Sequence, residues 1–432
     1  MKICILGRQP EIGLAELESL YGSNAVQPAG DQCALVNADV NFSRLGGSVK
    51  VAQHLTTIDD ISRKGIFRTV SHLVPKVLRN LPNKGKIKLG ISLYGFDISP
   101  YELGGEALRI KKAIKNSGRS VRVVPNETAA LSSAQTYHNH LADDMGIEFV
   151  IIHDGDRTHI GQVTNVQDID SYRIRDRERP KRDAFVGMLP PKLAQTIINL
   201  ATGNLEDASE TGTSSAIHLQ PESGLTETVS DPARSREAKE DTSRTEDTQI
   251  ILDPFCGTGV ILQESLLMGY GVYGTDLSKK MVDYSQINLK WLEKTKPMNA
   301  AGLVRLELAD ATDHIWRQPI SVVATEAFLG QPLGGQFPTK EKFAGIVHDT
   351  NIVIRDFFKN IVTQLPDGAR LCVAVPVWFH DGEVTHLPVV EELASIGFTQ
   401  RTFTHAETPL MYHREDQITG RELLVLRKNP SV

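Results

Sequence analysis

Two acids frame a glycine-rich turn in the C-terminal half of the chain, and their spacing is typical of a nucleotide site. The turn reads Asp253-Pro254-Phe255-Cys256-Gly257-Thr258-Gly259. An apolar run at 250–252 precedes it, a helical pattern follows at 260–268, and a second apolar run from 271 ends at Asp276. Glycines permit a tight turn close to a ligand, and an acid ending the second strand accepts hydrogen bonds from ribose hydroxyls. The pattern predicts a nucleotide-binding βαβ unit, with a glycine turn of some other α/β enzyme as the alternative.

The full seven-residue turn resembles the S-adenosylmethionine site of nucleic-acid amino-methyltransferases. The spacing is too short for a dinucleotide fingerprint, and the turn lacks the Gly-x-Gly-x-x-Gly order. We therefore expect an α/β fold with a Rossmann-like S-adenosylmethionine domain. The residues expected at the cofactor are Asp253, Phe255, Gly257, Gly259, Asp276, Leu277, Asp310 and Ala311.

Four acids fall where strands of the expected sheet end, which is where ligands bind in doubly wound sheets. We expect Asp253 to face the amino-acid part of the cofactor, Asp276 its ribose and Asp310 its adenine amino group. A loop acid or helix N-cap is an equal alternative for Asp310 taken alone. The fourth acid, Glu326, follows the apolar run at 320–324, where the reacting group is expected.

Glu326 and Phe328 are the expected catalytic residues. An amino group on a base is a poor nucleophile because its lone pair is delocalised into the ring. A carboxylate that accepts one of its N–H bonds favours pyramidalisation, and an aromatic ring stacks on a base turned out of its helix. Both residue types follow the strand at 320–324.

The composition is that of an ordinary globular protein of two or three domains. The chain has 432 residues with 40% hydrophobic and 23% charged residues. No apolar run reaches the length of a membrane span, and the N-terminus lacks the pattern of a signal peptide. The four cysteines are scattered without zinc spacing, so we expect no metal site, no membrane association and a cytoplasmic location.

The net charge of -6 is concentrated in one segment, 203–248, which has eleven acids and four bases. This segment is rich in Ser, Thr, Gly and Pro and has no periodic apolar pattern, so it is expected to be a disordered acidic insertion. An interaction segment that folds on a partner is the alternative. The rest of the chain is nearly neutral, so the overall acidity is weak evidence against a nucleic-acid partner.

Hydrophobic periodicity divides the chain into four parts. Residues 1–65 are expected to form a small α+β, ferredoxin-like unit, and 66–170 an α/β module with a helix at 131–145 and a hairpin around Asp154-Gly155. A basic linker is expected at 171–187. The remaining residues, 188–432, are expected to form the Rossmann-like domain that carries the insertion.

Basic residues gather in the second part and in the linker. Those selected as phosphate contacts are Arg109, Lys111, Lys112 and Lys115. The alternative for each cluster is a solvated helix face or a salt-bridged connector. Two such clusters beside a methyltransferase site favour binding to a phosphate backbone.

Several segments together resemble the THUMP-domain tRNA guanine-N2-methyltransferases. The resemblance rests on residues 6–11, 14–20, 179–183, 187–195, 253–259 and 420–422. It implies a THUMP-like module, tRNA as partner and formation of N2-methylguanosine, and an activator protein is a further possible partner that the sequence does not identify. One departure is clear: the family carries Asp-Pro-Pro-Tyr at the catalytic strand end, whereas this chain has Glu326-Ala327-Phe328-Leu329.

Two other functions remain open from the sequence. One is amino-methylation of rRNA or DNA, and the upstream RNA-binding module argues against DNA. The other is a catalytically weakened RNA-binding protein that keeps the cofactor pocket, which the loss of Asp-Pro-Pro-Tyr favours. The retained acids at the cofactor site argue against it.

Overall fold

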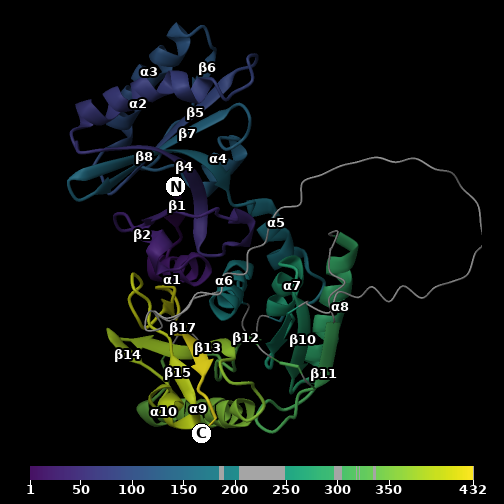
Figure 1. Ribbon diagram of the computed structural model, residues 1–432. Coiled ribbons are helices and arrows are strands. Elements are labelled where there is room, and N and C mark those ends of the chain that lie inside the picture. The colour runs from purple at the N-terminus through teal and green to yellow at the C-terminus, as the bar shows by residue number, and fades with distance from the viewer. Residues whose placement is uncertain are drawn as a thin grey trace, which may run out of the picture.

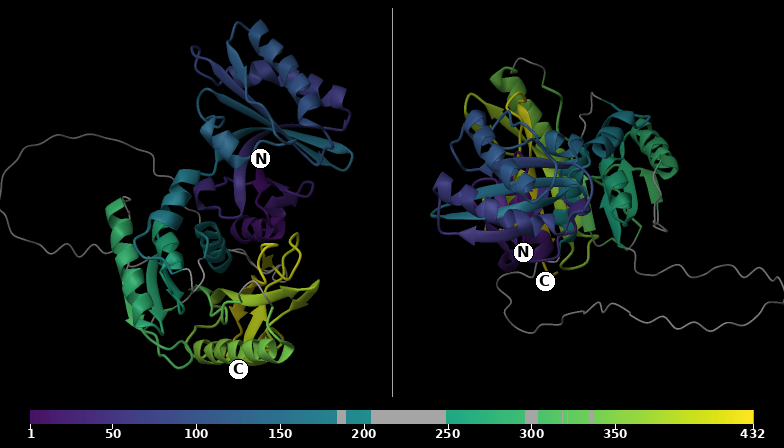
Figure 2. Two further views of the ribbon diagram at one scale, coloured as in Figure 1. Left: turned by 180° about the vertical axis from the view of Figure 1, so that it is seen from behind. Right: turned by 90° about the horizontal axis from the view of Figure 1, so that it is seen from above.

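The computed structural model describes residues 1–183, 189–203, 249–295, 304–317, 319–320, 322–333 and 337–431. Within these residues the strands form two sheets, an N-terminal one of eight strands and a C-terminal one of nine (Figure 1). Figure 2 shows the same two bodies from behind and from above. The acidic insertion expected at 203–248 lies outside the described residues from position 204 onward. Among the described helices, none is long and apolar enough to span a membrane.

The N-terminal sheet runs through both units that the sequence divides at position 65. Its order is β2-β3-β1-β4-β8-β7-β5-β6. Helices α2 (Arg63–Leu78) and α3 (Pro100–Asn116) pack their apolar sides on β5, β7 and β8. The strands are β1 (Lys2–Leu6), β2 (Val26–Pro28), β3 (Cys33–Val36), β4 (Ser48–Ile58), β5 (Ile87–Tyr94), β6 (Val121–Val123), β7 (Gly146–Asp154) and β8 (Arg157–Val166).

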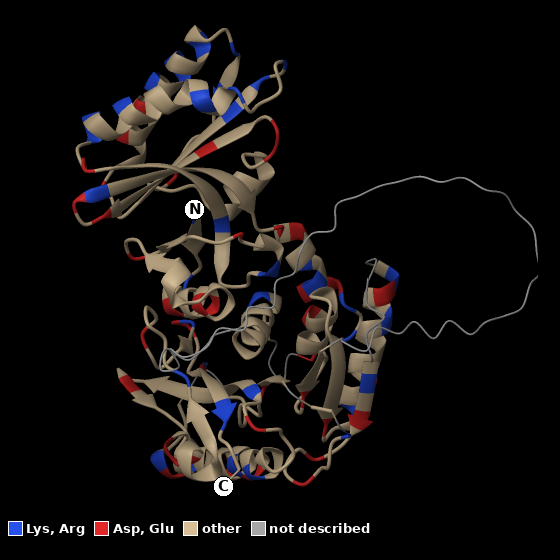
Figure 3. Cartoon of the chain, viewed as in Figure 1, with Lys and Arg blue, Asp and Glu red and all other residues tan. Residues whose placement is uncertain are grey.

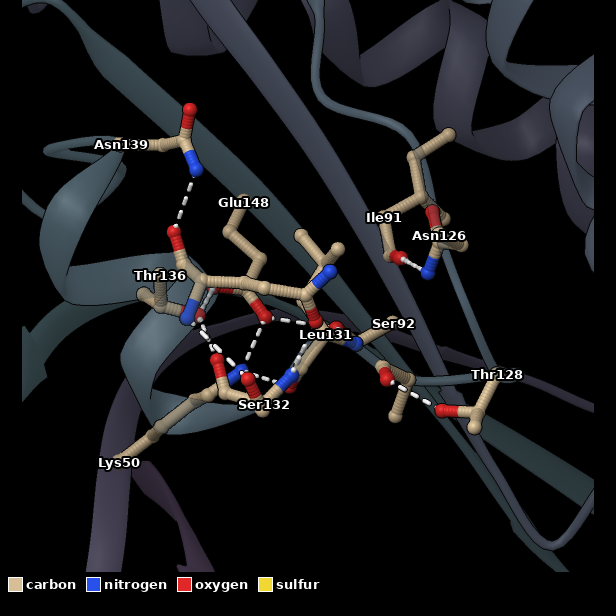
Figure 4. A network of polar contacts seen from close by, with 12 residues as sticks. Lys50, Ile91, Ser92, Asn126, Thr128, Leu131, Ser132, Thr136, Asn139 and Glu148 are labelled. Carbon is tan, nitrogen blue, oxygen red and sulfur yellow. Dashed lines mark hydrogen bonds and ion pairs between the residues drawn. The ribbon is translucent and has the colours of Figure 1, made fainter.

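A buried ion pair links β4 to β7 inside this sheet (Figure 4). Lys50 Nζ lies 2.6 Å from Glu148 Oε1, and both side chains are almost fully buried. Burial lowers the pKa of the Lys50 ammonium, and the Glu148 carboxylate opposes that shift. Hydroxyls of Ser92 (2.6 Å) and Thr136 (2.7 Å) donate to the same carboxylate. A buried charge pair is tolerated because its remaining hydrogen bonds are satisfied, and this one joins the two parts of the sheet.

The hairpin around Asp154-Gly155 is confirmed by β7 and β8, but the helix expected at 131–145 is wrong in length. Helix α4 covers only Ser133–His138. It ends because His140 adopts a positive φ of 55°, and the N–H of Leu141 then bonds back to Thr136 O at 3.0 Å. That closure is the usual C-terminal stop of a helix.

The C-terminal sheet has the order β11-β10-β9-β12-β13-β17-β15. Its strands from β11 to β13 are parallel, and β17 is antiparallel to β13 and β15. The strands are β9 (Ile250–Asp253), β10 (Gly271–Asp276), β11 (Val304–Leu308), β12 (Val322–Glu326), β13 (Arg370–His380), β14 (Glu383–Thr385), β15 (Phe398–Gln400), β16 (Met411–Tyr412) and β17 (Thr419–Lys428).

Helices lie on both faces of this sheet, as the sequence predicts for a doubly wound α/β domain (Figure 1). They are α6 (Pro191–Thr202), α7 (Val260–Leu267), α8 (Lys279–Thr295), α9 (Lys340–Val362) and α10 (Val389–Ile396). Strand β9 lies inside the sheet. The next strand along the chain, β10, pairs with one edge of β9, and β12 pairs with its other edge. The strand order reverses at this point, and in doubly wound sheets ligands bind beyond the carboxyl ends of the strands on either side of such a reversal.

Helix α1 (Pro10–Tyr21) packs on α6, so one apolar core joins the N-terminal unit to the C-terminal sheet. At the centre of this junction the buried carboxylate of Glu16 accepts hydrogen bonds from Gly46 N (2.9 Å), Gly47 N (2.8 Å) and Asn199 Nδ2 (2.8 Å). Burial raises the pKa of Glu16, and these donors oppose that shift. The contact fixes the first unit against the domain that carries the acids.

Further contacts from α1 hold the segment that leads into the terminal hairpin. Glu18 accepts the N–H groups of Thr404 (2.8 Å) and His405 (2.8 Å). Glu11 accepts the N–H of Glu407 at 2.6 Å. Helix α1 therefore lies against the segment 404–407 that precedes the terminal hairpin (Figure 1).

The residues expected as a basic linker, 171–187, are described up to 183 and are partly helical. Helix α5 covers Ile169–Arg173, and a π-helical turn covers Ile174–Glu178. Arg175 Nε lies 2.7 Å from Glu264 Oε1 of α7 in a buried ion pair. For Arg175, the structure supports the salt-bridged connector that the sequence left as the alternative.

Candidate functional site

The glycine turn begins at the last residue of β9, as the sequence predicts. Gly257 and Gly259 have φ values of +50° and +84°, which other residues rarely adopt, and α7 begins directly afterwards. A Cβ on Gly259 would lie 2.8 Å from Ser285 Oγ of α8. The N–H of Cys256 bonds to Thr275 O of β10 at 2.9 Å. The turn is therefore held tightly between β10 and α8.

Asp276 ends β10 and lies against the turn. Its Oδ2 accepts the N–H of Gly257 at 2.9 Å, and its Oδ1 accepts the N–H of Ser278 at 2.8 Å. Burial raises the pKa of Asp276, and the two N–H donors oppose that shift. The next side chain, Leu277, is 72% exposed although it is apolar. The structure thus brings the acid and the glycine turn together and places an uncovered apolar surface beside them.

Asp253 is the most deeply buried acid of the group, with 1% of its surface exposed. The hydroxyl of Thr325, on β12, donates to Asp253 Oδ1 at 2.6 Å, and the N–H of Phe255 donates at 3.3 Å. Burial raises the pKa of Asp253 to about 8, with smaller contributions from Asp276 and Glu326. The carboxyl is therefore largely protonated at neutral pH.

Asp310 follows β11, and its Oδ1 is used by its own loop. It accepts the N–H of Thr312 at 2.9 Å and the Thr312 hydroxyl at 2.7 Å. The N–H of Ala309 bonds to Asp276 O at 3.0 Å, so this loop begins beside Asp276. Ala311 is 4% exposed. Asp310 thus holds its own loop through one oxygen at a position next to the expected cofactor site, and its contact with adenine stays a prediction.

Glu326 is the last residue of β12, and it forms an ion pair that the sequence analysis did not foresee. Its Oε1 accepts the Nε–H of Arg421, from the start of β17. The two side chains are 15% and 9% exposed. The Arg421 guanidinium also lies 6.0 Å from the ring centre of Tyr412 on β16. Phe328, two residues beyond Glu326, is 44% exposed, so its ring is open to a ligand.

Phe255 is half-buried in an aromatic group under the turn. Its ring meets that of Phe357 on α9 edge to face, at 5.1 Å between centres. Further rings stack near the end of β13: Phe337 on His380 at 3.6 Å, and Phe379 on His413 at 3.7 Å. The sequence analysis missed these pairs and Arg421. The only signal for Arg421 was the triplet Gly420-Arg421-Glu422, which was used for resemblance and not for chemistry.

The four cations expected to bind phosphates lie on α3, far from the acids. Lys112 and Lys115 are exposed, Lys111 is half-buried, and Arg109 pairs with Glu106 of its own helix at 3.2 Å. Figure 3 shows further cations along the neighbouring helix α2. There, basic side chains repeat at helical spacing and are exposed: Lys64, Arg68, His72, Lys76 and Arg79. The spacing of four from 64 to 76 is a signal that the sequence analysis overlooked.

The strand order and its reversal beside β9 define a doubly wound α/β domain, and the acids clustered at the reversal make it the candidate ligand site. No family model matches the chain. It is similar to a tRNA (guanine(10)-N2)-dimethyltransferase of Methanothermobacter thermautotrophicus, with 30% identity over 128 residues, which is 29% of this chain and 32% of that protein. A protein of the same description from Pyrococcus abyssi is 52% identical over 44 residues, 10% of this chain and 13% of that one. The chain therefore matches about a third or less of the length of these relatives.

Among solved structures, the chain resembles TrmN from Thermus thermophilus. That comparison covers 99% of each chain at 16% identity, with a TM-score of 0.48.

Proposed function

We propose that the protein is an S-adenosylmethionine-dependent methyltransferase that acts on tRNA and forms N2-methylguanosine. The observation that carries the proposal is the meeting of Asp253, Asp276 and Glu326 at the carboxyl edge of three adjacent strands. Ligands of doubly wound sheets bind at this edge. The curated proteins that the chain matches in part are described as tRNA (guanine(10)-N2)-dimethyltransferases, which favours tRNA as the substrate.

The residues at this edge fit S-adenosylmethionine. A Cβ on Gly257 would meet only Phe255 O, at 3.9 Å, so the turn leaves space where a ligand must approach the backbone. Exposed Leu277 offers an apolar surface for adenine, and Asp276 offers carboxylate oxygens for ribose hydroxyls. Ala311 and the half-buried Phe255 complete the cofactor residues, with Asp310 at the adenine end. When bound, S-adenosylmethionine supplies an electrophilic methyl group.

Glu326 and Phe328 are the proposed catalytic pair. Glu326 accepts an N–H bond of the target amino group, which makes the nitrogen lone pair more available. The exposed ring of Phe328 stacks on the base once it has left its helix. Arg421 bonds to one oxygen of Glu326 and so fixes the orientation of the carboxylate, which makes Arg421 a positioning residue.

Substrate RNA is proposed to reach this edge from the N-terminal part, which would act as a THUMP-like binding module. The exposed cations of α2 and α3 lie on one outer layer and suit contact with a phosphate backbone (Figure 3). Phosphate contacts give affinity without distinguishing nucleotide sequence. The target nucleotide would therefore be selected by residues at the carboxyl edge of the C-terminal sheet.

The test is equilibrium binding of S-adenosylmethionine together with transfer of its labelled methyl group to bulk tRNA, rRNA and single-stranded DNA. Nucleoside mass spectrometry of the product is expected to show N2-methylguanosine in tRNA alone. Methyl label in rRNA or DNA, and none in tRNA, would replace tRNA by the other amino-group substrates.

A second candidate is a catalytically weakened RNA-binding protein that keeps the cofactor pocket. The observation that favours it is that one oxygen of Glu326 is occupied by Arg421, in a strand end that has lost Asp-Pro-Pro-Tyr. It predicts normal binding of S-adenosylmethionine and of tRNA, with no transfer to any nucleic acid. The same two measurements therefore separate it from the enzyme.

A further inference from the structure

A polar hollow lies where the first loop of the chain meets the terminal hairpin. Its volume is about 530 Å³, and it is lined by Arg8, Gln9, Tyr412, Arg414 and Asp416. The two walls are tied together because Gln9 Nε2 donates to His413 O at 2.7 Å. The contacts from α1 to the segment 404–407 fix the same junction. The hollow is thus a built feature between the loop that precedes α1 and the terminal hairpin.

The charges around the hollow suit an anion. Arg8 and Arg414 are both exposed and line it from opposite ends of the sequence. Within the described part of the chain, neither guanidinium has an ion-pair partner. Asp416 is the single acid of the lining, so the hollow keeps a net positive charge. Two guanidinium groups are well matched to a phosphate, because each presents paired N–H donors to its oxygens.

Tyr412 connects this hollow to the proposed catalytic acid. Its ring lines the hollow and also lies under the guanidinium of Arg421. That guanidinium is the one that bonds to Glu326. The hollow is therefore separated from Glu326 by two side chains. We expect a strand whose base reaches Glu326 to bring a neighbouring phosphate group toward this hollow.

We propose that Arg8 and Arg414 together bind a backbone phosphate of the RNA strand next to the nucleotide whose base enters at Glu326. The inference rests on the proposed function, since it names a substrate contact of that same site. It gives the N-terminal unit a second role: the unit completes the RNA site through its first loop, in addition to supporting the sheet that carries α2 and α3.

The test compares the full-length parent with Arg8→Ala, Arg414→Ala and the double variant, using end-labelled bulk tRNA as the probe. We expect the double variant to bind tRNA about tenfold more weakly, as loss of a charged hydrogen bond predicts. Its salt dependence should fall by about one unit in slope, because one phosphate contact is lost. In methyl transfer, KM for tRNA should rise while kcat changes little. Affinity for S-adenosylmethionine and the melting temperature should match the parent, because both arginines are exposed.

Two further variants sharpen the test. Asp416→Asn removes the one negative charge of the lining, so it should tighten tRNA binding. Lys359→Ala removes an exposed cation from α9, at the other end of the domain, and should leave affinity and slope unchanged.

The inference is overturned if the double variant binds tRNA with the affinity and slope of a parent that does transfer methyl groups to tRNA. That result would leave the proposed function unchanged and would exclude the phosphate site. A parent that binds S-adenosylmethionine but neither binds nor methylates tRNA would overturn both together.

Discussion

Arg421 donates its Nε–H to Oε1 of Glu326, and this bond joins the third residue of β17 to the last residue of β12. Both side chains are largely buried, so their charges are only weakly screened by solvent. One carboxylate oxygen is thereby fixed, and the carboxylate has a single preferred orientation. If Glu326 accepts the target N–H, its geometry depends on Arg421.

We expect Arg421→Met to lower kcat and to leave the affinity for S-adenosylmethionine unchanged. Arg421→Lys loses the fork geometry but keeps the positive charge. It should therefore retain more activity than Arg421→Met. Combined with Glu326→Gln in a double-mutant cycle on kcat/KM, the arginine should show a coupling of about 0.5–3 kcal/mol. Strict additivity of the two substitutions would mean that Arg421 acts independently of Glu326.

Glu326→Ala is expected to reduce single-turnover methyl transfer by about a hundred- to a thousandfold, the usual loss for a preorganised electrostatic group. Glu326→Gln keeps an oxygen acceptor and should lose less. Phe328→Ala should weaken RNA binding by about 1–3 kcal/mol, because a stacked base loses its platform. A Glu326→Ala protein with the parent rate on a verified substrate would remove Glu326 from the mechanism.

Asp276→Ala should weaken binding of S-adenosylmethionine by about 1.5–3 kcal/mol in calorimetry, since hydrogen bonds to a charged group are lost. The matched control is Asp283→Ala, on the exposed side of α8, where the acid pairs with Lys279 at 3.1 Å. The control should bind as the parent does. Equal affinities for all three proteins would take Asp276 out of the cofactor site.

The raised pKa of Asp253 should make the stability of the folded protein depend on pH. Its pKa of about 8 lies above the ordinary 3.8, so the folded protein holds a proton that the unfolded chain has released at pH 7. The stability from this proton is complete below pH 3.8 and is lost as the pH rises toward 8. The free energy of unfolding of the parent should therefore fall between these values, relative to Asp253→Asn.

The ammonium group of S-adenosylmethionine favours the ionised carboxylate, so its binding should release a proton from Asp253. Calorimetry at pH 7 in two buffers of different ionisation enthalpy should then give different apparent binding enthalpies. The difference should disappear in Asp253→Asn. Identical enthalpies for the parent in both buffers would show that Asp253 does not face the ammonium group.

Lys112→Ala and Lys115→Ala should each weaken tRNA binding across sequences and lower the salt slope by about one unit, as expected for a phosphate contact. Lys111→Ala should have a smaller effect because the side chain is half-buried. Arg109→Ala should likewise have a smaller effect, because Arg109 already pairs with Glu106. The measurement is a salt series with labelled tRNA, with Lys359→Ala as the charge control. A lysine whose loss changes neither quantity belongs to a solvated helix face.

The parts of the site that are close together along the chain could be predicted without a structure. Asp253, the glycine turn and Asp276 lie within one contiguous strand, turn, helix and strand, so their spacing fixes their proximity. The hairpin of β7 and β8 was likewise predicted from a local signal, the Asp-Gly turn between two strand patterns. It failed for the helix at 131–145, because the positive φ of His140 ends that helix where apolar periodicity continues.

Contacts between side chains that are far apart along the chain depend on the three-dimensional fold. Arg421 and Glu326 are 95 positions apart, and Gln9 and His413 are 404 apart. Arg421 reaches Glu326 because β17 runs antiparallel to β13, so its first residues lie at the edge where the parallel strands end. Arg8 and Arg414 line one hollow because α1 packs on α6 and holds the segment before the hairpin. Such long-range contacts depend on the order of strands in the sheet and on helix packing. They cannot be predicted from local hydrophobic periodicity.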